Sequence, residues 1–149
     1  MNMLVYQFSI IQMAAHATLS KAGRKNLEDF SLNSAQWRIL GLLSEHPTGA
    51  RIADIEAVTF IQSTQVNPLI KELLSRQLIR KTPHPEDGRA NLLLITSRGR
   101  DVLDEIESRM QKTLADIMQD ATSDDFQIYM KVLQSIIKYG NSQGDHNGS

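Results

Sequence analysis

Apolar residues recur at helical spacing near both ends of the chain. Leu4, Phe8, Ile11 and Ala15 follow one another at steps of three or four residues, which predicts an amphipathic helix running to about Leu27. Two stripes near the other end predict two further helices. One stripe is Leu103, Ile106, Met110, Leu114 and Ile117, and the other is Phe126, Met130, Leu133 and Ile137.

The middle of the chain changes from helical to strand periodicity. The expected elements are a helix capped by Ser31 or Asn33, a helix from Arg51 to about Thr59, a helix ending near Gln77, and strands over residues 78–82 and 91–96 joined by a turn rich in Pro, Gly and Asp. This order predicts a mainly α fold with a small β-hairpin wing (α+β). It is typical of a winged helix-turn-helix with added terminal helices.

The pattern divides the chain into four parts. They are an N-terminal helix over residues 1–30, a DNA-binding domain over 31–98, C-terminal helices over 99–140 and a polar, disordered tail over 141–149.

The terminal helices carry more apolar surface than a small winged helix can cover. Interleaving them with the same helices of a second chain would bury it, so we expect a homodimer. A monomeric bundle, in which the stripes cover each other, is the alternative. The residues expected at the dimer interface are Leu4, Phe8, Ile11, Leu114, Ile117, Phe126, Met130, Leu133 and Ile137.

Charge is distributed unevenly along the chain. The formal net charge is −1, yet residues 48–100 carry eight Lys and Arg against five Asp and Glu, whereas residues 101–149 carry four against nine. The positive excess therefore coincides with the helix-turn-helix pattern, and a dimer would double it on one surface.

Several other functions are disfavoured by composition. With no cysteine, the chain has no disulfide and no thiol-based sensing. Its four histidines are scattered without ligand spacing, so neither a metal nor another cofactor is expected. No phosphate-binding loop or nucleophile motif indicates an enzyme. The N-terminus lacks the basic start of a secretory signal, and no window is long and apolar enough to span a membrane, which predicts a cytoplasmic protein.

The helix before the hairpin has the polar start of a recognition helix. In a helix-turn-helix these first residues reach base edges in the major groove, and amide, hydroxyl and ammonium groups can bond bases or phosphates there. The candidates are Gln62, Ser63, Thr64, Gln65, Asn67 and Lys71. Pro68 requires either that the helix begins as late as Thr64 or Gln65, or that it is bent.

The hairpin turn carries Asp87 and Arg89 two residues apart. An arginine at a hairpin tip can enter a narrow, A·T-rich minor groove, and Asp87 can hold its guanidinium by a charge-assisted bond. Arg80 and Lys81 are candidate phosphate contacts beside it. The alternative is an ordinary Asp-Gly turn with a solvated arginine.

Three segments resemble the MarR (multiple antibiotic resistance regulator) family over roughly residues 4–140. They are SLNSAQWRILGLL, IADIEAVTFIQSTQVNPLIKELLSRQLIRK and PHPEDGRANLLLITSRGRDVL. The resemblance implies a homodimer joined through its first, fifth and sixth helices, with Arg89 in the minor groove. It also implies a pseudo-palindromic promoter site and, usually, a repressor released by a small ligand. Pro68 and Gln77, which stands where the family commonly has glycine, depart from the pattern.

The resemblance also suggests a cleft for a small aromatic or anionic effector. An arginine beside apolar and aromatic surface can hold a carboxylate. The candidates are Met13, His16, Trp37, Arg38 and Met110, each of which is alternatively an ordinary core or surface residue. A protein-interaction or DNA-architectural module without an effector is the competing function.

Overall fold

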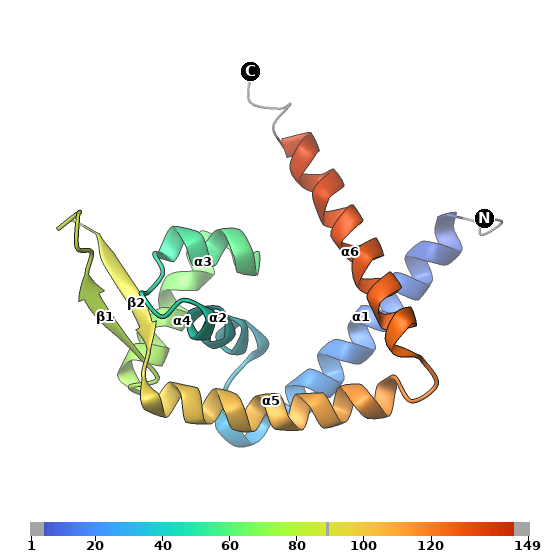
Figure 1. Ribbon diagram of the computed structural model, residues 1–149, viewed down its shortest axis with the longest axis horizontal. Coiled ribbons are helices and arrows are strands. Elements are labelled where there is room, and N and C mark those ends of the chain that lie inside the picture. The colour runs from blue at the N-terminus through green and yellow to red at the C-terminus, as the bar shows by residue number, and fades with distance from the viewer. Residues whose placement is uncertain (1–4, 89, 145–149) are drawn as a thin grey trace. The chain divides into compact units, whose positions relative to one another are not determined.

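The computed structural model describes residues 5–88 and 90–144, which are mainly helical (Figure 1). Two compact units divide the chain, one within residues 1–111 and one within residues 112–149. The elements are α1 (Val5–Leu27), the 3-10 helix η1 (Glu28–Phe30), α2 (Ser34–Glu45), α3 (Ile52–Thr59), α4 (Ser63–Ser75), β1 (Ile79–Pro83), β2 (Asn91–Ile95), α5 (Ser97–Ile117) and α6 (Ser123–Gly144). The predicted fold class, mainly α with a β-hairpin, is confirmed.

Capping side chains set where two of these helices begin. Of the two caps considered for α2, the structure uses Asn33, whose Oδ1 accepts the Gln36 N–H at 2.9 Å while Gln36 Oε1 accepts the Asn33 N–H at 3.0 Å. At α6, Asp125 Oδ2 accepts from the Thr122 N–H at 2.8 Å and the Asp125 N–H donates to Thr122 Oγ1 at 3.2 Å. The hydrogen bonds from Thr122 lower the pKa of Asp125, because they favour the charged carboxylate.

Two helix ends differ from the predicted ones. α4 ends at Ser75 rather than near Gln77, because Gln77 takes a left-handed conformation with φ 57°. α6 continues through Gly144, so residues 141–144 are helical and not part of a disordered tail. Within this last part of α6, the Ser142 Oγ donates to the Tyr139 carbonyl oxygen at 2.8 Å. Residues 145–149 of the predicted tail lie outside the described residues.

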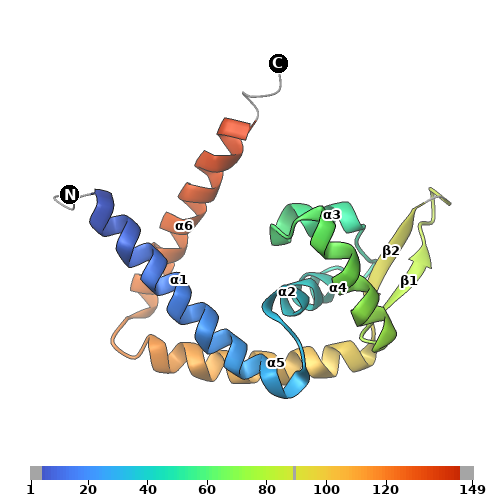
Figure 2. The same ribbon diagram turned by 180° about the vertical axis from the view of Figure 1, so that it is seen from behind.

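The core of the first unit forms around α2. Its inward face is fully buried through Ile39, Leu40 and Leu43. Other elements add buried side chains to the same cluster, among them Ile55 of α3, Val66, Ile70 and Leu73 of α4, Leu93 of β2, and Leu103 and Ile106 of α5. Seen from behind, α2, α3 and α4 lie together beside the hairpin (Figure 2). This packing holds α3 and α4 as one rigid helix-turn-helix.

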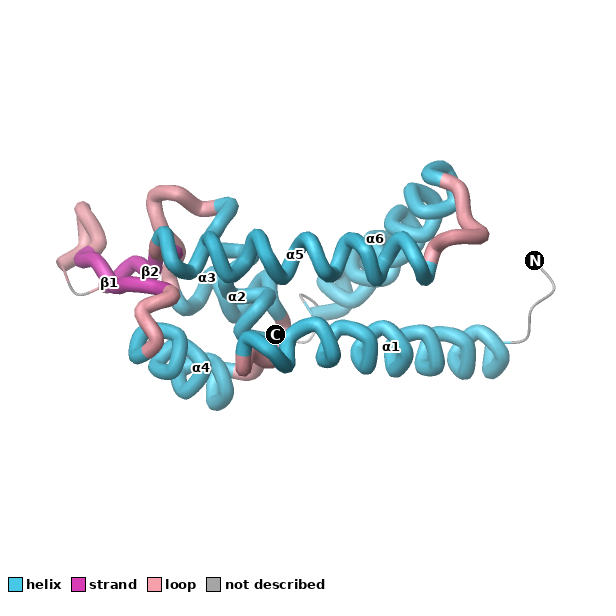
Figure 3. Tube along the Cα trace, turned by 90° about the horizontal axis from the view of Figure 1, so that it is seen from below, coloured by secondary structure: helices cyan, strands magenta, loops and turns pink. Residues whose placement is uncertain are grey.

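The hairpin extends beyond these helices at one end of the first unit (Figure 3). β1 and β2 pair antiparallel, from Ile79 opposite Ile95 to Pro83 opposite Asn91. A third segment joins the sheet just before α3: Ala50 and Leu93 exchange two backbone hydrogen bonds of 3.0 and 2.9 Å. The start of α3 is therefore fixed directly to the wing.

Thr96 joins the base of the wing to the end of α4 and the start of α5. Its Oγ1 donates toward the carbonyl oxygens of Gln77 and Leu78, at 2.7 and 3.0 Å, and accepts the Gly99 N–H at 3.0 Å. A Cβ at position 99 would lie 2.0 Å from the Leu78 carbonyl oxygen. Only glycine therefore permits this close approach of α5 to the hairpin.

Replacing Gln77 by glycine should stabilise the protein. A left-handed conformation costs an ordinary L-residue about 1–2 kcal/mol, and glycine avoids this cost while losing about 0.5–1 kcal/mol of chain entropy. We expect Gln77→Gly to raise the urea midpoint slightly. Glu72→Gly, at an exposed site within α4, is the control and should lower stability by about 1 kcal/mol. Equal destabilisation by both variants would contradict the strain at Gln77.

Candidate nucleic-acid interface

α4 separates into a buried apolar face and an exposed polar one. Val66, Ile70 and Leu73 are buried in the core of the first unit. The predicted DNA-contacting residues of this helix and its cap are all exposed, namely Gln62, Ser63, Thr64, Gln65, Asn67 and Lys71. The arrangement matches a helix that is held by one side and presents the other to a groove.

Pro68 lies inside α4, because the helix begins at Ser63. Of the two alternatives for Pro68, the late start at Thr64 or Gln65 is therefore wrong, and a bend stays a prediction. Proline has no N–H, so the Thr64 carbonyl lacks its usual donor four residues on. The apolar residues on the buried face keep the segment helical despite that loss.

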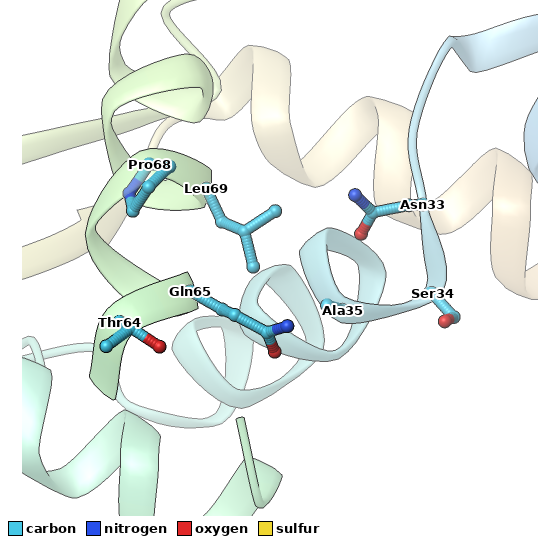
Figure 4. Close-up of a pocket in the computed structure, with 7 residues that line it drawn as sticks. All are labelled: Asn33, Ser34, Ala35, Thr64, Gln65, Pro68 and Leu69. Carbon is cyan, nitrogen blue, oxygen red and sulfur yellow. The ribbon is translucent and has the colours of Figure 1, made fainter. Parts of the chain in front are cut away.

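The first turns of α4 face the start of α2 across an open pocket of about 440 Å³. Gln65 and Leu69 point from α4 toward α2, and Asn33 and Ser34 lie on the opposite wall (Figure 4). No charged side chain lines this pocket. Gln65 thus lies on the edge of α4 nearest α2.

The wing brings basic side chains to the surface. Arg80 and Lys81 of β1 are exposed, and they pair across the hairpin with Leu94 and Leu93. Asp87 is exposed in the turn, where its carbonyl oxygen accepts the Ala90 N–H at 3.0 Å. Arg89, the predicted minor-groove residue, lies outside the described residues, so its contact with Asp87 stays a prediction.

A contact that the sequence did not predict joins the wing to α3. Arg51 Nη2 lies 3.0 Å from His84 Nε2, although the two residues are 33 positions apart. The other ring nitrogen of His84 accepts the backbone N–H groups of Glu86 and Asp87, both at 3.2 Å. No periodicity links an arginine before a helix to a histidine in a later turn, so only the fold reveals this pair.

The predicted effector residues lie on three different helices, α1, α2 and α5. Met13 and His16 are exposed on α1. Trp37 donates from Nε1 to Glu107 Oε1 of α5 at 2.7 Å, one turn from Met110, whose sulfur accepts from Asn26 Nδ2 at 3.6 Å.

Arg38 instead lines a separate pocket of about 210 Å³ with Gly41, Leu42, Glu45, Val58 and Thr59. Trp37 thus contacts α5, which carries Met110, whereas Arg38 lies near α3. The role of these residues in effector binding stays a prediction.

A charged cluster around Arg109 joins η1 to α5. Arg109 donates to Asp29 at 2.6 Å and to Glu105 at 2.9 Å, and its guanidinium carbon lies 4.7 Å from the centre of the Phe30 ring. The hydrogen bonds to Asp29 and Glu105 raise the pKa of Arg109. Because these ion pairs are exposed, they contribute little to the free energy of folding, and their main effect is to position η1 against α5.

Two kinds of site are not found in the described part of the chain. No group of three or more His, Asp or Glu residues there is arranged to hold a metal ion. The helices among these residues include none with the length and apolar character needed to cross a membrane.

Comparison with known proteins agrees with this geometry. Residues 30–90, which include the helix-turn-helix and most of the wing, match the MarR family model. No curated protein matches the chain.

Solved structures share the whole fold. A MarR-family transcriptional regulator from Rhodococcus sp. RHA1 has a TM-score of 0.80 at 21% identity, covering 91% of this chain and 96% of that one. A mutant MarR from E. coli complexed with operator DNA has a TM-score of 0.76 at 15% identity, covering 89% and 94%. The PcaV transcriptional regulator from Streptomyces coelicolor, in complex with its natural ligand, has a TM-score of 0.69 at 18% identity, covering 90% and 92%.

Residues 30–90 therefore resemble the MarR family, and the chain shares the fold of solved MarR-family transcriptional regulators.

Two substitutions on α4 should separate base reading from phosphate binding. Gln65→Ala should lower affinity for the preferred sequence by about 1–3 kcal/mol and relax the preference at one base pair, because an amide can bond a base bidentately. Lys71→Ala should weaken binding to all sequences alike and flatten the salt dependence. Fluorescence anisotropy on matched and single-mismatch duplexes measures both. A uniform loss in Gln65→Ala would contradict base contact by Gln65.

Proposed function

We propose that this protein is a homodimeric repressor that binds a pseudo-palindromic promoter operator and is released by a small aromatic or anionic ligand. The observation that carries the proposal is the division of α4 into a buried face and an exposed polar face. A helix held in this way, followed by a hairpin, can lie in a major groove while the wing enters the adjacent minor groove.

Unpartnered apolar surface on α1 supports the dimer. Ile11 is 60% exposed and Phe8 41% exposed, and such surface in water is costly unless another chain covers it. Leu4 of the predicted interface lies outside the described residues.

The second unit carries a similar apolar surface on α6. Met130 is 40% and Ile137 48% exposed, while Phe126 and Leu133 are half-buried. At the end of α5, Leu114 and Ile117 are also exposed, by 39% and 43%. A second copy of the chain would cover these residues and bring two copies of α4 to one duplex.

Release by a ligand is supported by the relative solved with its natural ligand and by the chemistry of α2. Arg38, which lines a pocket with Val58 and Thr59 of α3, offers a guanidinium that pairs with carboxylates. A ligand bound near α2 acts on α4 because the two helices pack in one core. Screening aromatic acids for loss of operator binding tests this step.

Selection of binding sites from random duplex DNA tests the proposal as a whole. We expect a two-fold symmetric sequence with half-sites about one helical turn apart, near 10 base pairs. If the selection enriches no sequence at low salt, the result would contradict an operator-specific regulator. It would favour an architectural or protein-interaction module.

Arg89→Ala should weaken operator binding by about 1–3 kcal/mol, the scale of one good groove contact. Arg89→Lys keeps the charge but loses the planar fork, so its affinity should lie between those of wild type and Arg89→Ala. Operator titrations, with dimer mass checked by sedimentation, give the comparison. A folded, dimeric Arg89→Ala protein with unchanged affinity would remove the minor-groove contact.

Ile137→Asp should dissociate the dimer, because a buried isoleucine contributes about 1.5–3 kcal/mol and the substitution occurs in both copies. Ser135→Asp is the matched control, since Ser135 is exposed on α6 and falls on the opposite side of the helix from the predicted interface stripe. Sedimentation equilibrium measures the dissociation constant of each variant. A dimer unaffected by Ile137→Asp would place the interface elsewhere.

A further inference from the structure

The pocket beside Arg38 lies between α2 and the last turn of α3. Its volume is about 210 Å³, and four of its six lining residues belong to α2, namely Arg38, Gly41, Leu42 and Glu45. Residues at this spacing follow one face of a helix, so the four form a single stripe along α2. Val58 and Thr59 line the pocket from α3.

The two ends of the stripe carry opposite charges. Arg38 and Glu45 lie almost two helical turns apart on α2, which separates their α-carbons by about 10 Å. Both residues are exposed, and neither forms an ion pair with any residue in the described part of the chain. The stripe between them consists of Gly41 and Leu42. The pocket therefore combines an apolar middle with a cation at one end and an anion at the other.

Gly41 leaves space in the middle of this pocket that the fold itself does not need. The residue lies in the interior of α2, where glycine is less favourable than alanine. A Cβ at position 41 would meet no atom of the rest of the protein within 4 Å, and its backbone is not left-handed. Neither close packing nor backbone conformation therefore requires glycine here, and the open space is available to a ligand.

The charges and the size of the pocket define the class of ligand. The guanidinium of Arg38 can hold a carboxylate by two parallel hydrogen bonds, and the carboxylate of Glu45 can accept from an ammonium group. Leu42 and Val58 can contact an apolar segment between these two groups. Drug-sized ligands occupy pockets of about 300–1,000 Å³, so the fitting molecule is smaller than these. A ligand with a single charge would leave one end of the pocket unpaired.

We propose that the pocket between α2 and α3 binds a small zwitterion, whose carboxylate and ammonium are separated by an apolar spacer. The site rests on the proposed function, because it names the chemical class of the ligand that releases the protein from DNA. α3 ends at Thr59 and α4 begins at Ser63. A ligand bound against the end of α3 therefore acts close to the start of the recognition helix.

Three benzene derivatives of similar size test the requirement for both charges. 4-(Aminomethyl)benzoate carries a carboxylate and an ammonium, 4-methylbenzoate only the carboxylate, and 4-methylbenzylamine only the ammonium. Isothermal titration calorimetry on the protein without DNA measures each dissociation constant. We expect the zwitterion to bind about tenfold more tightly than either of the other two, the scale of one charge-assisted contact. It should also weaken operator binding in fluorescence anisotropy.

Two neutral variants assign each charge of the ligand to one end of the pocket. Glu45→Gln should bind the zwitterion and 4-methylbenzoate equally, because the ammonium has lost its partner. Arg38→Gln should bind the zwitterion and 4-methylbenzylamine equally. Asp104→Asn removes an exposed carboxylate from α5 and is the control, which should keep the wild-type preference. An unchanged preference in both site variants would overturn the site.

Gly41→Ala distinguishes a binding role from a structural one. The variant should have a higher melting temperature, since alanine favours the helix and the added Cβ meets nothing. It should bind the zwitterion about tenfold more weakly, because the methyl group occupies the pocket. A more stable variant with wild-type affinity for the zwitterion would contradict binding against Gly41.

The outcomes for the site and for the proposed function can be told apart. If the protein binds its selected operator but shows no preference for the zwitterion, the site is overturned and operator binding stands. If the zwitterion is preferred by a protein that binds no duplex, the site stands and the proposed repressor is overturned. If the zwitterion is preferred but operator affinity does not change, its role in release is overturned.

Discussion

The hydroxyl of Thr96 is the point on which the arrangement of α4, the wing and α5 depends. It bonds the two carbonyl groups at which the chain leaves α4 and enters β1, and it also caps α5. The recognition helix, the wing and the long helix therefore share one anchor. Gly99 makes the anchor possible, because any side chain there would collide with the Leu78 carbonyl. The angle between helix and wing is thus fixed by the chain's own backbone.

Much of the fold follows from local sequence signals. The Asn33–Gln36 and Thr122–Asp125 spacings are capping boxes in the structure, since such bonds need only residues three positions apart. The misplaced boundaries have a different cause. Pro68 and Gln77 are locally unfavourable where they stand, and burial of Val66, Ile70 and Leu73 overrides the propensity of proline. Such overrides depend on tertiary packing, which single-residue preferences do not contain.

The candidate site could be predicted from the sequence only where it depends on local spacing. Helical spacing alone separates the exposed edge of α4 from its buried face, so Gln65, Asn67 and Lys71 could be chosen from the sequence. The Arg51–His84 contact could not, because it arises from the pairing of Ala50 with Leu93. The sequence also did not predict that Trp37 contacts α5 while the adjacent Arg38 faces α3. Adjacent residues on a helix point about 100° apart, so neighbours in sequence need not face one ligand.

The bond between Trp37 and Glu107 has a practical consequence. The chain contains one tryptophan, and its indole N–H is held by a carboxylate at the junction of α2 and α5. The tryptophan emission of the protein therefore reports on a single place, the contact between α2 and α5. Any event that separates these two helices would change the surroundings of Trp37 and shift its emission wavelength. The separation of α2 from α5 can therefore be followed by fluorescence without an added label.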